Sequence, residues 1–423
     1  MRVKPGYKKT EVGVIPQDWE VKPLHELADK IMVGIASAAT HAYRERGVVM
    51  FRNQNIKPGY LDDSDVLYIA EEYENTYRNK RLRSGDLLTA RTGYPGTTAI
   101  VPEQYEGAQS FTTLITRPCP TLIDSRYLCC FINSSAGQTY FEQNQIGGGQ
   151  KNVNAGSLQH LLVPLPPTKA EQEAIARALG DVDALIESLD QLLAKKLHVK
   201  QGAMQELLTG KRRLPGFSGD WQTCRFDDEF VVLRNASNSR SELSGTGEVA
   251  YVHYGDVHTH PSAFLDPTTK GTFIPRTKVR TVPRLTDGDL LMVDASEDTT
   301  AIGKAVEIVG LNGREAVAGL HTMCLRGDKD GLADGFKGYL QFLPQVRAAL
   351  VRLATGVSVY GITKSGVKAI EVTIPKPDEQ TAIAGILSDM DAEIGAVEAK
   401  LEKARQIKQG MMQELLTGQT RLV

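Results

Sequence analysis

Two stretches of the chain carry side chains that can form paired hydrogen bonds with the edges of nucleic-acid bases. The candidates in the first stretch are Arg44, Arg46, Arg52, Asn53, Gln54, Asn55, Arg81, Arg91 and Tyr94, and those in the second are Tyr251, His253, Tyr254, Arg276 and Lys278. Arginine, asparagine and glutamine read base edges, whereas lysine and arginine hold phosphates. Ordinary charged strands and loops would have the same composition, so residue type alone leaves both interpretations open.

Two glycine-bearing loops add to these candidates. The segments Ile146 to Asn154 and Thr355 to Thr363 contain Gln150 and Lys151 in the first and Ser358 and Tyr360 in the second. Glycine lets a backbone approach a phosphate closely, but it also serves plain tight turns.

The sequence offers little for catalysis. It contains no glycine-rich phosphate loop ending in Gly-Lys-Ser/Thr, and no Asn/Asp-Pro-Pro-aromatic run of the kind that a base-methylating site would show. His253, His258 and His260 form the sharpest metal-like cluster, but their spacing fits no usual zinc pattern. A solvated or DNA-facing loop is therefore favoured over a metal-dependent hydrolase, and we expect no catalytic residue and no metal.

The elements that must position these residues occur twice. Strand-and-loop patterns at 48–61 and 249–265 are each followed by Gly-Asp-Leu-Leu, at Gly85 and Gly288, which indicates a turn entering a strand. We predict return strands at 97–100 and 299–302, and short helices at 124–131 and 336–343. The tips between the strands differ, since 91–94 contains Arg91 whereas 294–298 is acidic. We therefore expect the second module to use its 251–260 loop for base contacts.

The clearest repeat is QGAMQELLTG at 201–210, which returns as QGMMQELLTG at 409–418. Upstream of each copy, apolar residues alternate at spacings of three and four, a pattern typical of a coiled coil. Prolines precede each helix, and Gly210 and Gly418 are expected to end them. The predicted packing residues are Ile175, Leu179, Val182, Ile186, Leu189 and Leu193 in the first helix, and Ile383, Leu387, Met390, Ile394, Val397 and Leu401 in the second.

The composition restricts the class of protein. The 49 Lys and Arg residues balance 51 Asp and Glu residues, so a DNA-binding surface would have to be a local patch. Five cysteines without paired spacing suggest a reducing cytoplasm, and no apolar run approaches the length of a membrane span. These features predict a cytoplasmic protein.

The organisation resembles the specificity subunit of type I restriction-modification systems. The resemblance covers nearly the whole chain and depends on the Pro-x-Pro entry followed by Glu171-Gln172 or Glu379-Gln380, the Gln-x-x-x-Gln-Glu-Leu-Leu-Thr-Gly-x-x-Arg-Leu ends from Gln201 and Gln409, the Gly-Asp-Leu-Leu turns, and the Asp-Trp pairs ending at Trp19 and Trp221. It implies a non-catalytic subunit in which two target-recognition domains each read half of a split, asymmetric DNA site, and two antiparallel helices set the gap.

The resemblance also implies partners and cofactors. These are double-stranded DNA, two methyltransferase subunits that use S-adenosylmethionine to methylate adenine, and two motor-nuclease subunits that use ATP and Mg. This chain itself is expected to bind no cofactor. The alternative is a non-catalytic coiled-coil scaffold or adaptor that binds proteins rather than DNA.

We therefore expect an α+β fold of two tandem repeats, each a mixed α/β target-recognition domain followed by a long helix, with the two helices packed as an antiparallel coiled coil. The predicted boundaries are 1–167 for the first domain, 168–212 for the first spacer helix, 213–377 for the second domain and 378–423 for the second spacer helix.

Overall fold

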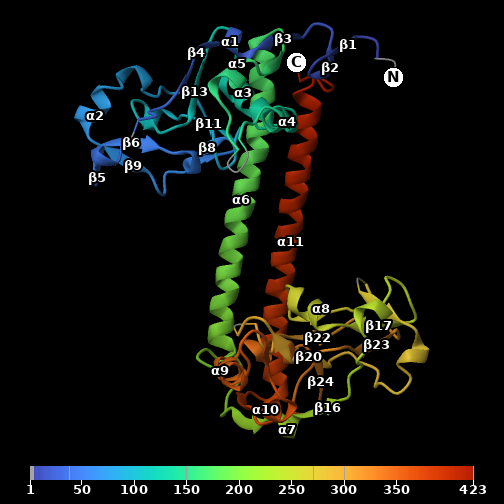
Figure 1. Cartoon of the computed structure of the whole chain (residues 1–423). Coiled ribbons are helices and arrows are strands. Elements are labelled where there is room, and N and C mark those ends of the chain that lie inside the picture. The colour runs from blue at the N-terminus through green and yellow to red at the C-terminus, as the bar shows by residue number, and fades with distance from the viewer. Residues whose placement is uncertain are drawn as a thin grey trace. The chain divides into compact units, whose positions relative to one another are not determined.

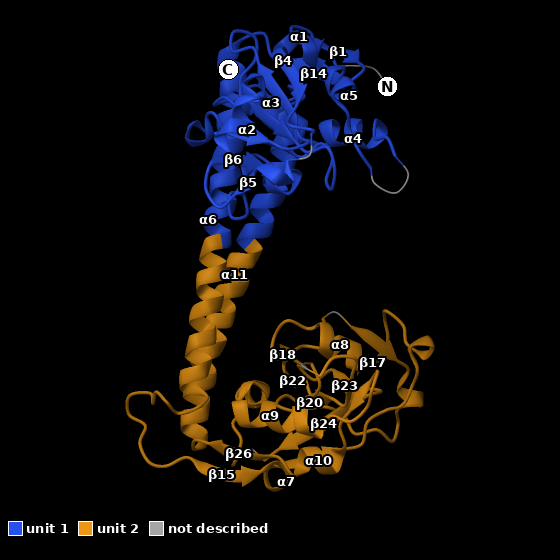
Figure 2. Ribbon diagram, turned by 60° about the vertical axis from the view of Figure 1, so that its left-hand side comes forward, with its two compact units in different colours: residues 1–190, 400–423 blue, residues 191–399 orange. Residues whose placement is uncertain are grey.

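The computed structural model describes residues 4–37, 39–147, 151–269, 271–299, 301–328 and 330–422. The chain forms two compact units, shown in different colours in Figure 2. Unit 1 comprises residues 1–190 and 400–423, and unit 2 comprises residues 191–399. Each long helix therefore contributes residues to both units, whereas we predicted separate helical segments.

Unit 1 contains two four-stranded sheets, and its main core includes the fully buried Trp19. The first sheet has the strand order β11 (Thr98–Ile100), β10 (Leu87–Thr89), β13 (Leu114–Pro118), β4 (Ala28–Val33); the second has the order β12 (Gln109–Ser110), β6 (Val48–Phe51), β9 (Leu67–Ile69), β5 (Tyr43–Arg44). Two-stranded pairs join β1 (Tyr7–Thr10) to β2 (Gly13–Pro16), β3 (Glu20–Pro23) to β14 (Leu162–Leu165), and β7 (Ile56–Lys57) to β8 (Tyr60–Leu61). The short α-helices are α1 (Leu24–Leu27), α2 (Glu71–Asn75), α3 (Ser125–Ile132), α4 (Ser135–Gln143) and α5 (Ala155–Gln159).

Unit 2 contains a five-stranded and a three-stranded sheet. The larger has the order β16 (Phe230–Leu233), β24 (Thr322–Gly327), β20 (Leu290–Val293), β22 (Ala305–Ile308), β18 (Phe264–Leu265); the smaller has the order β19 (Thr272–Ile274), β17 (Val249–Val252), β23 (Glu315–Ala318). Two further pairs join β15 (Gln222–Arg225) to β26 (Glu371–Ile374) and β21 (Ala295–Ser296) to β25 (Tyr360–Gly361). The short α-helices are α7 (Phe226–Glu229), α8 (Tyr254–Thr259), α9 (Pro344–Leu353) and α10 (Lys364–Lys368).

The Gly-Asp-Leu-Leu turn has the same packing in both units. Asp86 is buried and accepts hydrogen bonds from Nε and Nη2 of Arg117 at 2.9 and 2.7 Å. Asp289 is equally buried and accepts them from Arg326 at 2.8 and 2.7 Å. A buried carboxylate needs such a partner, so the turn is tied to the strand that pairs with the one it enters.

The two long helices are α6 (Lys169–Leu207) and α11 (Pro377–Leu415), coloured green and red in Figure 1. The predicted terminators Gly210 and Gly418 follow them with φ of 68° and 67°, values that favour glycine. No helix within the described residues is long and apolar enough to cross a membrane.

The residues that we predicted to pack between the helices all lose solvent exposure. Those that are buried are Ile175, Leu179, Ile383, Leu387, Ile394, Val397 and Leu401, and those that are half-buried are Val182, Ile186, Leu189, Leu193 and Met390.

Lysines at two positions of the same apolar seam are paired across the helices. In unit 1, Lys408 Nζ lies 2.5 Å from Asp183 Oδ1. In unit 2, Lys200 pairs with Asp391, which also accepts a hydrogen bond from the hydroxyl of Tyr339 at 3.1 Å. Within each unit a lysine-aspartate pair thus joins the two helix segments, and a second ion pair does the same, Arg405–Asp190 in unit 1 and Lys196–Glu393 in unit 2.

The glutamine that begins each long helix fastens it to the neighbouring domain. Gln172 Oε1 accepts from the backbone N–H of Asp124 at 2.8 Å. Gln380 Oε1 accepts from the N–H of Ala333 at 2.9 Å, and its Nε2 donates to the carbonyl of Pro375 at 2.8 Å. Both glutamines are almost fully buried, so the Glu-Gln pair of the sequence marks a structural joint.

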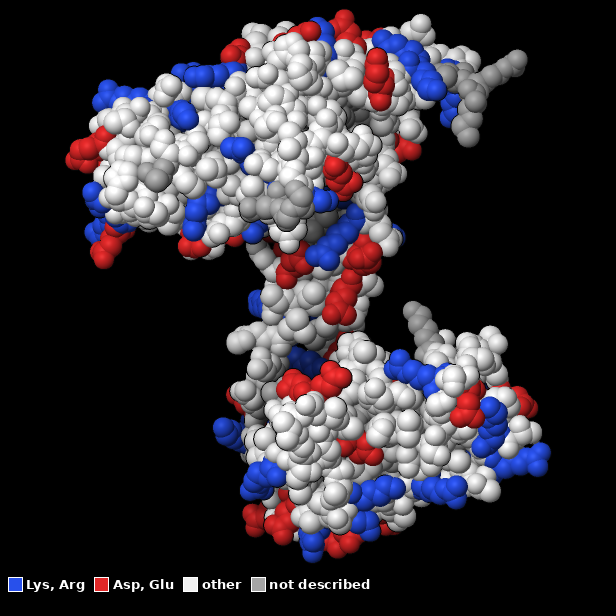
Figure 3. Space-filling view, viewed as in Figure 1, with Lys and Arg blue, Asp and Glu red and all other residues white. Residues whose placement is uncertain are grey.

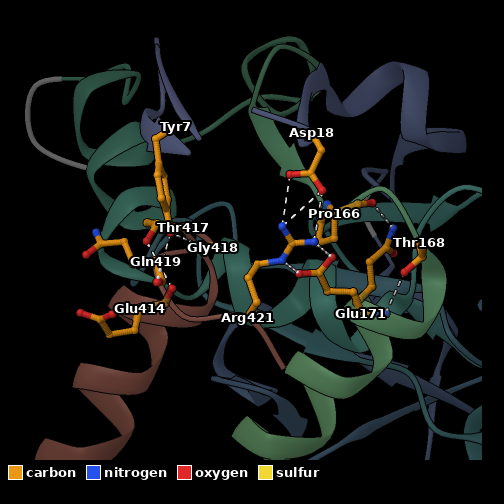
Figure 4. A network of polar contacts seen from close by, with 11 residues as sticks. Tyr7, Asp18, Pro166, Thr168, Glu171, Glu414, Thr417, Gly418, Gln419 and Arg421 are labelled. Carbon is orange, nitrogen blue, oxygen red and sulfur yellow. Dashed lines mark hydrogen bonds and ion pairs between the residues drawn. The ribbon is translucent and has the colours of Figure 1, made fainter. Parts of the chain in front are cut away.

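The glutamate of the same pair holds the segment that follows the other helix. In unit 2, Arg213 donates from Nε and Nη2 to the two oxygens of Glu379 at 2.6 and 2.7 Å, and its guanidinium lies 5.8 Å from the ring of Trp221. In unit 1, Arg421 makes the same forked contact with Glu171 (Figure 4). Its guanidinium also lies 5.9 Å from the ring of Trp19.

Two local predictions need correction, and a third is confirmed. The segment predicted as the second return strand is not a strand in its described residues; the return strand is β22, a few residues later, because 301–303 form a turn. The helix predicted at 336–343 is the 3-10 helix η7 (Lys337–Phe342), followed by α9, whose first residue is Pro344. The first return strand is confirmed as β11, in register with β10.

Candidate nucleic-acid interface

Three loops of unit 1 meet at Asn53. Its Oδ1 accepts from the backbone N–H of Arg91 at 2.7 Å, and its Nδ2 donates to Oγ1 of Thr112 at 3.3 Å. The carbonyl of Arg91 accepts from the N–H of Val153, in the glycine-bearing loop, at 3.1 Å. The loops that follow β6 and β10, the turn before β13 and the glycine-bearing loop are thus bonded to one another.

The corresponding loops of unit 2 meet at Tyr254, Asp294 and His321. The His321 ring lies edge-on to the Tyr254 ring with centroids 5.7 Å apart, and its Nδ1 lies 3.2 Å from Oδ1 of Asp294. The carbonyl of Asp294 accepts from the N–H of Ile362 at 2.9 Å, which is the same connection that Arg91 makes to Val153 in unit 1.

Strand register identifies the residues that correspond. Leu88 pairs with Ile115 and Leu291 pairs with Cys324, so Arg91 corresponds to Asp294, and Thr112 to His321. Thr112 and His321 have φ of 53° and 57°, the left-handed region that non-glycine residues rarely adopt. Such a strained conformation is typical of functional sites.

The first residues of the loops after β6 and β17 also correspond. The N–H of Arg52 donates to Asn55 Oδ1 at 2.8 Å, and the N–H of His253 donates to Asp256 Oδ2 at 2.8 Å. Asn53 and Tyr254 each follow such a capping residue. Burial lowers the pKa of His253, and the nearby Arg240 adds to the effect, so this imidazole favours the neutral form that accepts from the N–H of Gly255.

Two predicted base-contacting residues are structural instead. Asn55 is 2 % exposed, and its Nδ2 donates to the carbonyls of Asp62 and Asp65. Tyr251 is 1 % exposed, and its hydroxyl donates to the carbonyl of Asn238. Their hydrogen bonds are used inside the protein, so we withdraw both from the interface.

Several predicted basic residues are held by carboxylates. Arg81 Nε lies 2.6 Å from Oε1 of the buried Glu74, and this contact is the main reason that the pKa of Glu74 is lowered. Arg52 Nη2 and Gln54 Nε2 both donate to Asp65 Oδ2, at 2.9 and 2.7 Å.

The basic candidates of unit 2 are similarly paired. Arg276 Nε lies 3.1 Å from Glu315 Oε2, and Lys278 Nζ lies 3.0 Å from Glu242 Oε1. Figure 3 shows basic and acidic side chains intermingled on the visible face of each unit, which agrees with the even charge balance of the sequence.

The remaining candidates that the structure describes are exposed or half-buried. Arg44, Arg46, Lys151 and Ser358 are exposed, Tyr94 is 84 % exposed, and Tyr360 is half-buried in β25. Gln150 lies outside the described residues.

The three histidines of the metal-like cluster have separate backbone contacts. His258 Nε2 lies 3.1 Å from the carbonyl of Ala295, His260 Nε2 lies 2.6 Å from that of Phe264, and His253 caps α8. Across the described ranges, no group of three or more His, Cys, Asp and Glu residues is arranged to hold a metal.

A cavity of about 420 Å³ adjoins the unit 2 loops. It is lined by Tyr254, His258, Ala295, Ser296, Glu297, Asp298, Ala301, His321 and Val359. Its wall combines aromatic faces with hydrogen-bonding groups.

Sequence reasoning missed Thr112 and His321, and it set Asp294 aside because an acidic tip opposes a phosphate backbone. Glycine or asparagine can signal a left-handed residue, but threonine and histidine carry no such signal. The strand register was the information needed to find these positions.

Comparisons with known proteins agree with these features. Residues 16–195 match the family described as type I restriction modification DNA specificity domain. The putative type I restriction enzyme MjaX specificity subunit of Methanocaldococcus jannaschii is 24 % identical over 442 residues, covering 99 % of this chain and 97 % of the relative. The MjaVIII specificity subunit of the same organism is 30 % identical over 219 residues, covering 49 % of this chain and 50 % of the relative.

Solved structures share the fold. The S subunit of a type I restriction-modification system from M. genitalium matches with a TM-score of 0.61 at 12 % identity, over 98 % of both chains. A chain from a structure of the type I R-M system matches with a TM-score of 0.55 at 16 % identity, over 96 % of this chain and 99 % of that one. The chain is thus similar to type I restriction-modification specificity subunits over nearly its whole length, carries a match to their DNA specificity domain at 16–195, and shares the mixed α/β fold of the solved structures.

Proposed function

We propose that this chain is the sequence-reading subunit of a type I restriction-modification complex, and that its two units read the two halves of a split, asymmetric DNA site. The observation that carries the proposal is the loop frame of unit 1, which recurs in unit 2 with the same strand register and the same backbone bond to the glycine-bearing loop, but with different side chains at matching positions. A common frame with unlike side chains is what two readers of different short sequences require.

In this proposal the chain is two tandem repeats, and α6 and α11 form an antiparallel coiled coil that fixes the gap between the half-sites. The buried seam and the two lysine-aspartate pairs support this arrangement. Apolar side chains of α6 are also exposed at seven-residue spacing, at Leu185, Leu192 and Val199. Exposed apolar residues in a row are typical of protein-binding surfaces, and we assign them to the docking of two methyltransferase subunits.

Chemistry belongs to the partners in this scheme. The methyltransferase subunits would hold S-adenosylmethionine, and two motor-nuclease subunits would hold ATP and Mg. This chain would contribute recognition and spacing, bind no cofactor, and catalyse no step.

The proposal is tested by expressing the chain with its methyltransferase subunit and mapping methylated adenines across a host genome. We expect one motif made of two short specified sequences separated by a fixed number of unspecified bases. Methylation without a motif, or one contiguous motif, would contradict the proposal. Assembly with partner proteins but no sequence-dependent DNA affinity would instead support a protein-binding scaffold.

The spacing role has its own test. Four residues inserted at the tip end of one long helix, outside the two lysine-aspartate pairs, should lengthen the unspecified gap and leave the bases specified in both half-sites unchanged. A change in those bases would exclude a role of the helices in spacing alone.

A further inference from the structure

We infer that each unit reads its half-site through one set of three residues, which we call the reading set: Asn53, Arg91 and Thr112 in unit 1, and Tyr254, Asp294 and His321 in unit 2. This inference rests on the proposed function and assigns it to particular side chains. Arg91 and Asp294 are the base-contacting members, and the other members position them or complete the surface.

The unit 1 set presents a hydrogen-bond donor. Two hydrogen bonds fix the backbone of Arg91. Its N–H donates to Asn53 Oδ1, and its carbonyl accepts from the N–H of Val153. Its Nε also donates to the carbonyl of Val153 at 3.3 Å, and its two Nη groups have no partner within the described residues. An arginine that is held at its base and open at its end can donate both Nη groups. The base edge that accepts two such bonds is O6 and N7 of guanine.

The unit 2 set presents an acceptor at the same place. Asp294 has the backbone position of Arg91, and its carboxylate lies beside the His321 imidazole. A carboxylate is repelled by phosphates, so its useful contact with DNA is an amino group on a base edge. In the major groove, the amino group that donates a hydrogen bond to aspartate is N4 of cytosine.

The third member of each reading set is the residue with a left-handed backbone, Thr112 in unit 1 and His321 in unit 2. Thr112 is bonded to Asn53, and His321 contacts both Tyr254 and Asp294. A glycine would adopt this backbone conformation without strain. The presence of threonine and histidine there indicates that their side chains have a role in the site. In unit 2 the histidine and tyrosine also face the cavity, where they add apolar and hydrogen-bonding surface beside the contacted base.

The two sets predict different letters in the two half-sites. The unit 1 half-site should contain a guanine whose identity depends on Arg91, and the unit 2 half-site should contain a cytosine whose identity depends on Asp294. Because the sets occupy matching positions in matching frames, each letter should have the same place within its own half-site.

The test uses the complex of the full chain with its methyltransferase subunit and compares methylomes of variants. Arg91→Ala should relax one guanine by about 10- to 100-fold in discrimination and leave the other half-site and the gap unchanged. Asp294→Asn should move one position of the other half-site from cytosine toward adenine, because an amide pairs with adenine N6 and N7. Arg83→Ala is the matched control, since Arg83 is exposed in unit 1 and is neither in the set nor among the predicted base-contacting residues; it should change no letter.

Glycine variants separate reading from folding. Thr112→Gly and His321→Gly remove side chains at left-handed positions, so the melting temperature should stay the same or rise while discrimination in the matching half-site falls. Asn312→Gly is the control, because Asn312 also has a positive φ, of 48°, but lies outside both sets; it should alter neither half-site.

The possible outcomes distinguish the inference from the proposed function. If the unaltered complex methylates without a motif, the proposed function fails. If it methylates a split motif but Arg91→Ala and Asp294→Asn keep every letter with unchanged discrimination, the reading sets are overturned and the proposed function stands. If these variants lose capture of the methyltransferase subunit while every letter is kept, the sets are protein contacts and the inference is likewise overturned.

Discussion

In both units, the segment that follows one long helix binds a glutamate near the start of the other long helix, and we call this contact the joint. The two joints differ in how the chain connects their parts. In unit 2, the segment after α6 reaches Glu379 through Arg213 and continues along the chain to Trp221. In unit 1, the segment after α11 reaches Glu171 through Arg421, but its contacts with Asp18 and Trp19 join residues about 400 positions apart in sequence. The forked ion pair, the arginine over the indole ring and the left-handed glycine occur in both joints. The contacts are therefore sufficient to form the joint without a local covalent connection.

The largest expected effect comes from removing the segment after α11. Truncation after Leu416 should destabilise unit 1 by about 4 kcal/mol or more, because it leaves Glu171 buried without a partner and uncovers Trp19. Calorimetry and hydrogen exchange of the full chain and the truncated chain would measure the loss. The control is a protease cut within 214–220, which leaves Arg213 in place, so the unit 2 joint should survive. Unchanged protection of unit 1 after truncation would show that the contacts do not hold it.

Substituting each arginine separately sharpens the comparison. Arg421→Ala and Arg213→Ala each break an ion pair to a buried glutamate and should cost about 3 kcal/mol. The local consequences should differ, because residues 417–422 can leave unit 1, whereas residues 208–221 remain tethered in unit 2. Hydrogen exchange should therefore rise steeply in the first segment and only slightly in the second. Equal exchange in both would contradict the distinction.

A smaller effect on the stability of both units is expected when the pH is lowered. The Arg81 contact holds the pKa of Glu74 below its ordinary value of 4.5, and the Lys278 contact lowers that of Glu242. For a carboxyl group whose folded pKa is lowered, the stabilisation is present above the unfolded pKa and is lost as the pH falls through the folded pKa. Both units should therefore lose stability below about pH 4.5.

The two ion pairs should respond differently to salt. The Glu74 side chain is 2 % exposed and that of Glu242 is 35 % exposed, so 1 M salt should remove the second contribution and spare the first. Melting curves of Glu74→Gln and Glu242→Gln from pH 3 to 6, at low and high salt, measure both. An equal salt response would mean that burial does not distinguish the pairs.

The smallest effect should follow from replacing the seam lysines. Lys408→Leu and Lys200→Leu should each change stability by no more than about 1 kcal/mol, because an apolar residue can replace a partly buried ion pair. Asp391 keeps the Tyr339 hydroxyl as a partner, whereas Asp183 is half exposed to water. Denaturant unfolding would measure both variants, and a loss of several kcal/mol in either would show that the pair itself is needed for folding.

The parts of the fold that depend on local pattern could be predicted from the sequence. The apolar spacing of the long helices and the glycines that end them appear in the structure near the expected places. The turn before β10 was predicted from Gly-Asp-Leu-Leu, but its partner Arg117 was not, because the contact joins residues 31 positions apart. The second return strand was misplaced because Thr299 and Ile302 have strand propensity, whereas residues 301–303 form a turn.

The candidate site was predicted less well than the fold. Asn55 and Tyr251 have suitable side chains but are buried, and Arg81 is paired with Glu74. Exposure and pairing depend on residues far along the chain, and propensity does not report them. Thr112 and His321 were not found because nothing in their side chains signals a positive φ.

The lysine-aspartate pairs have a consequence for how this molecule can be altered. If one helix slid along the other by a single turn, Lys200 and Lys408 would move away from Asp391 and Asp183. Each lysine-aspartate pair therefore favours one register of the two helices. An insertion between the two pairs in one helix alone should be resisted, because it would move one lysine away from its aspartate, whereas matched insertions in both helices, or insertions outside the pairs, should be tolerated.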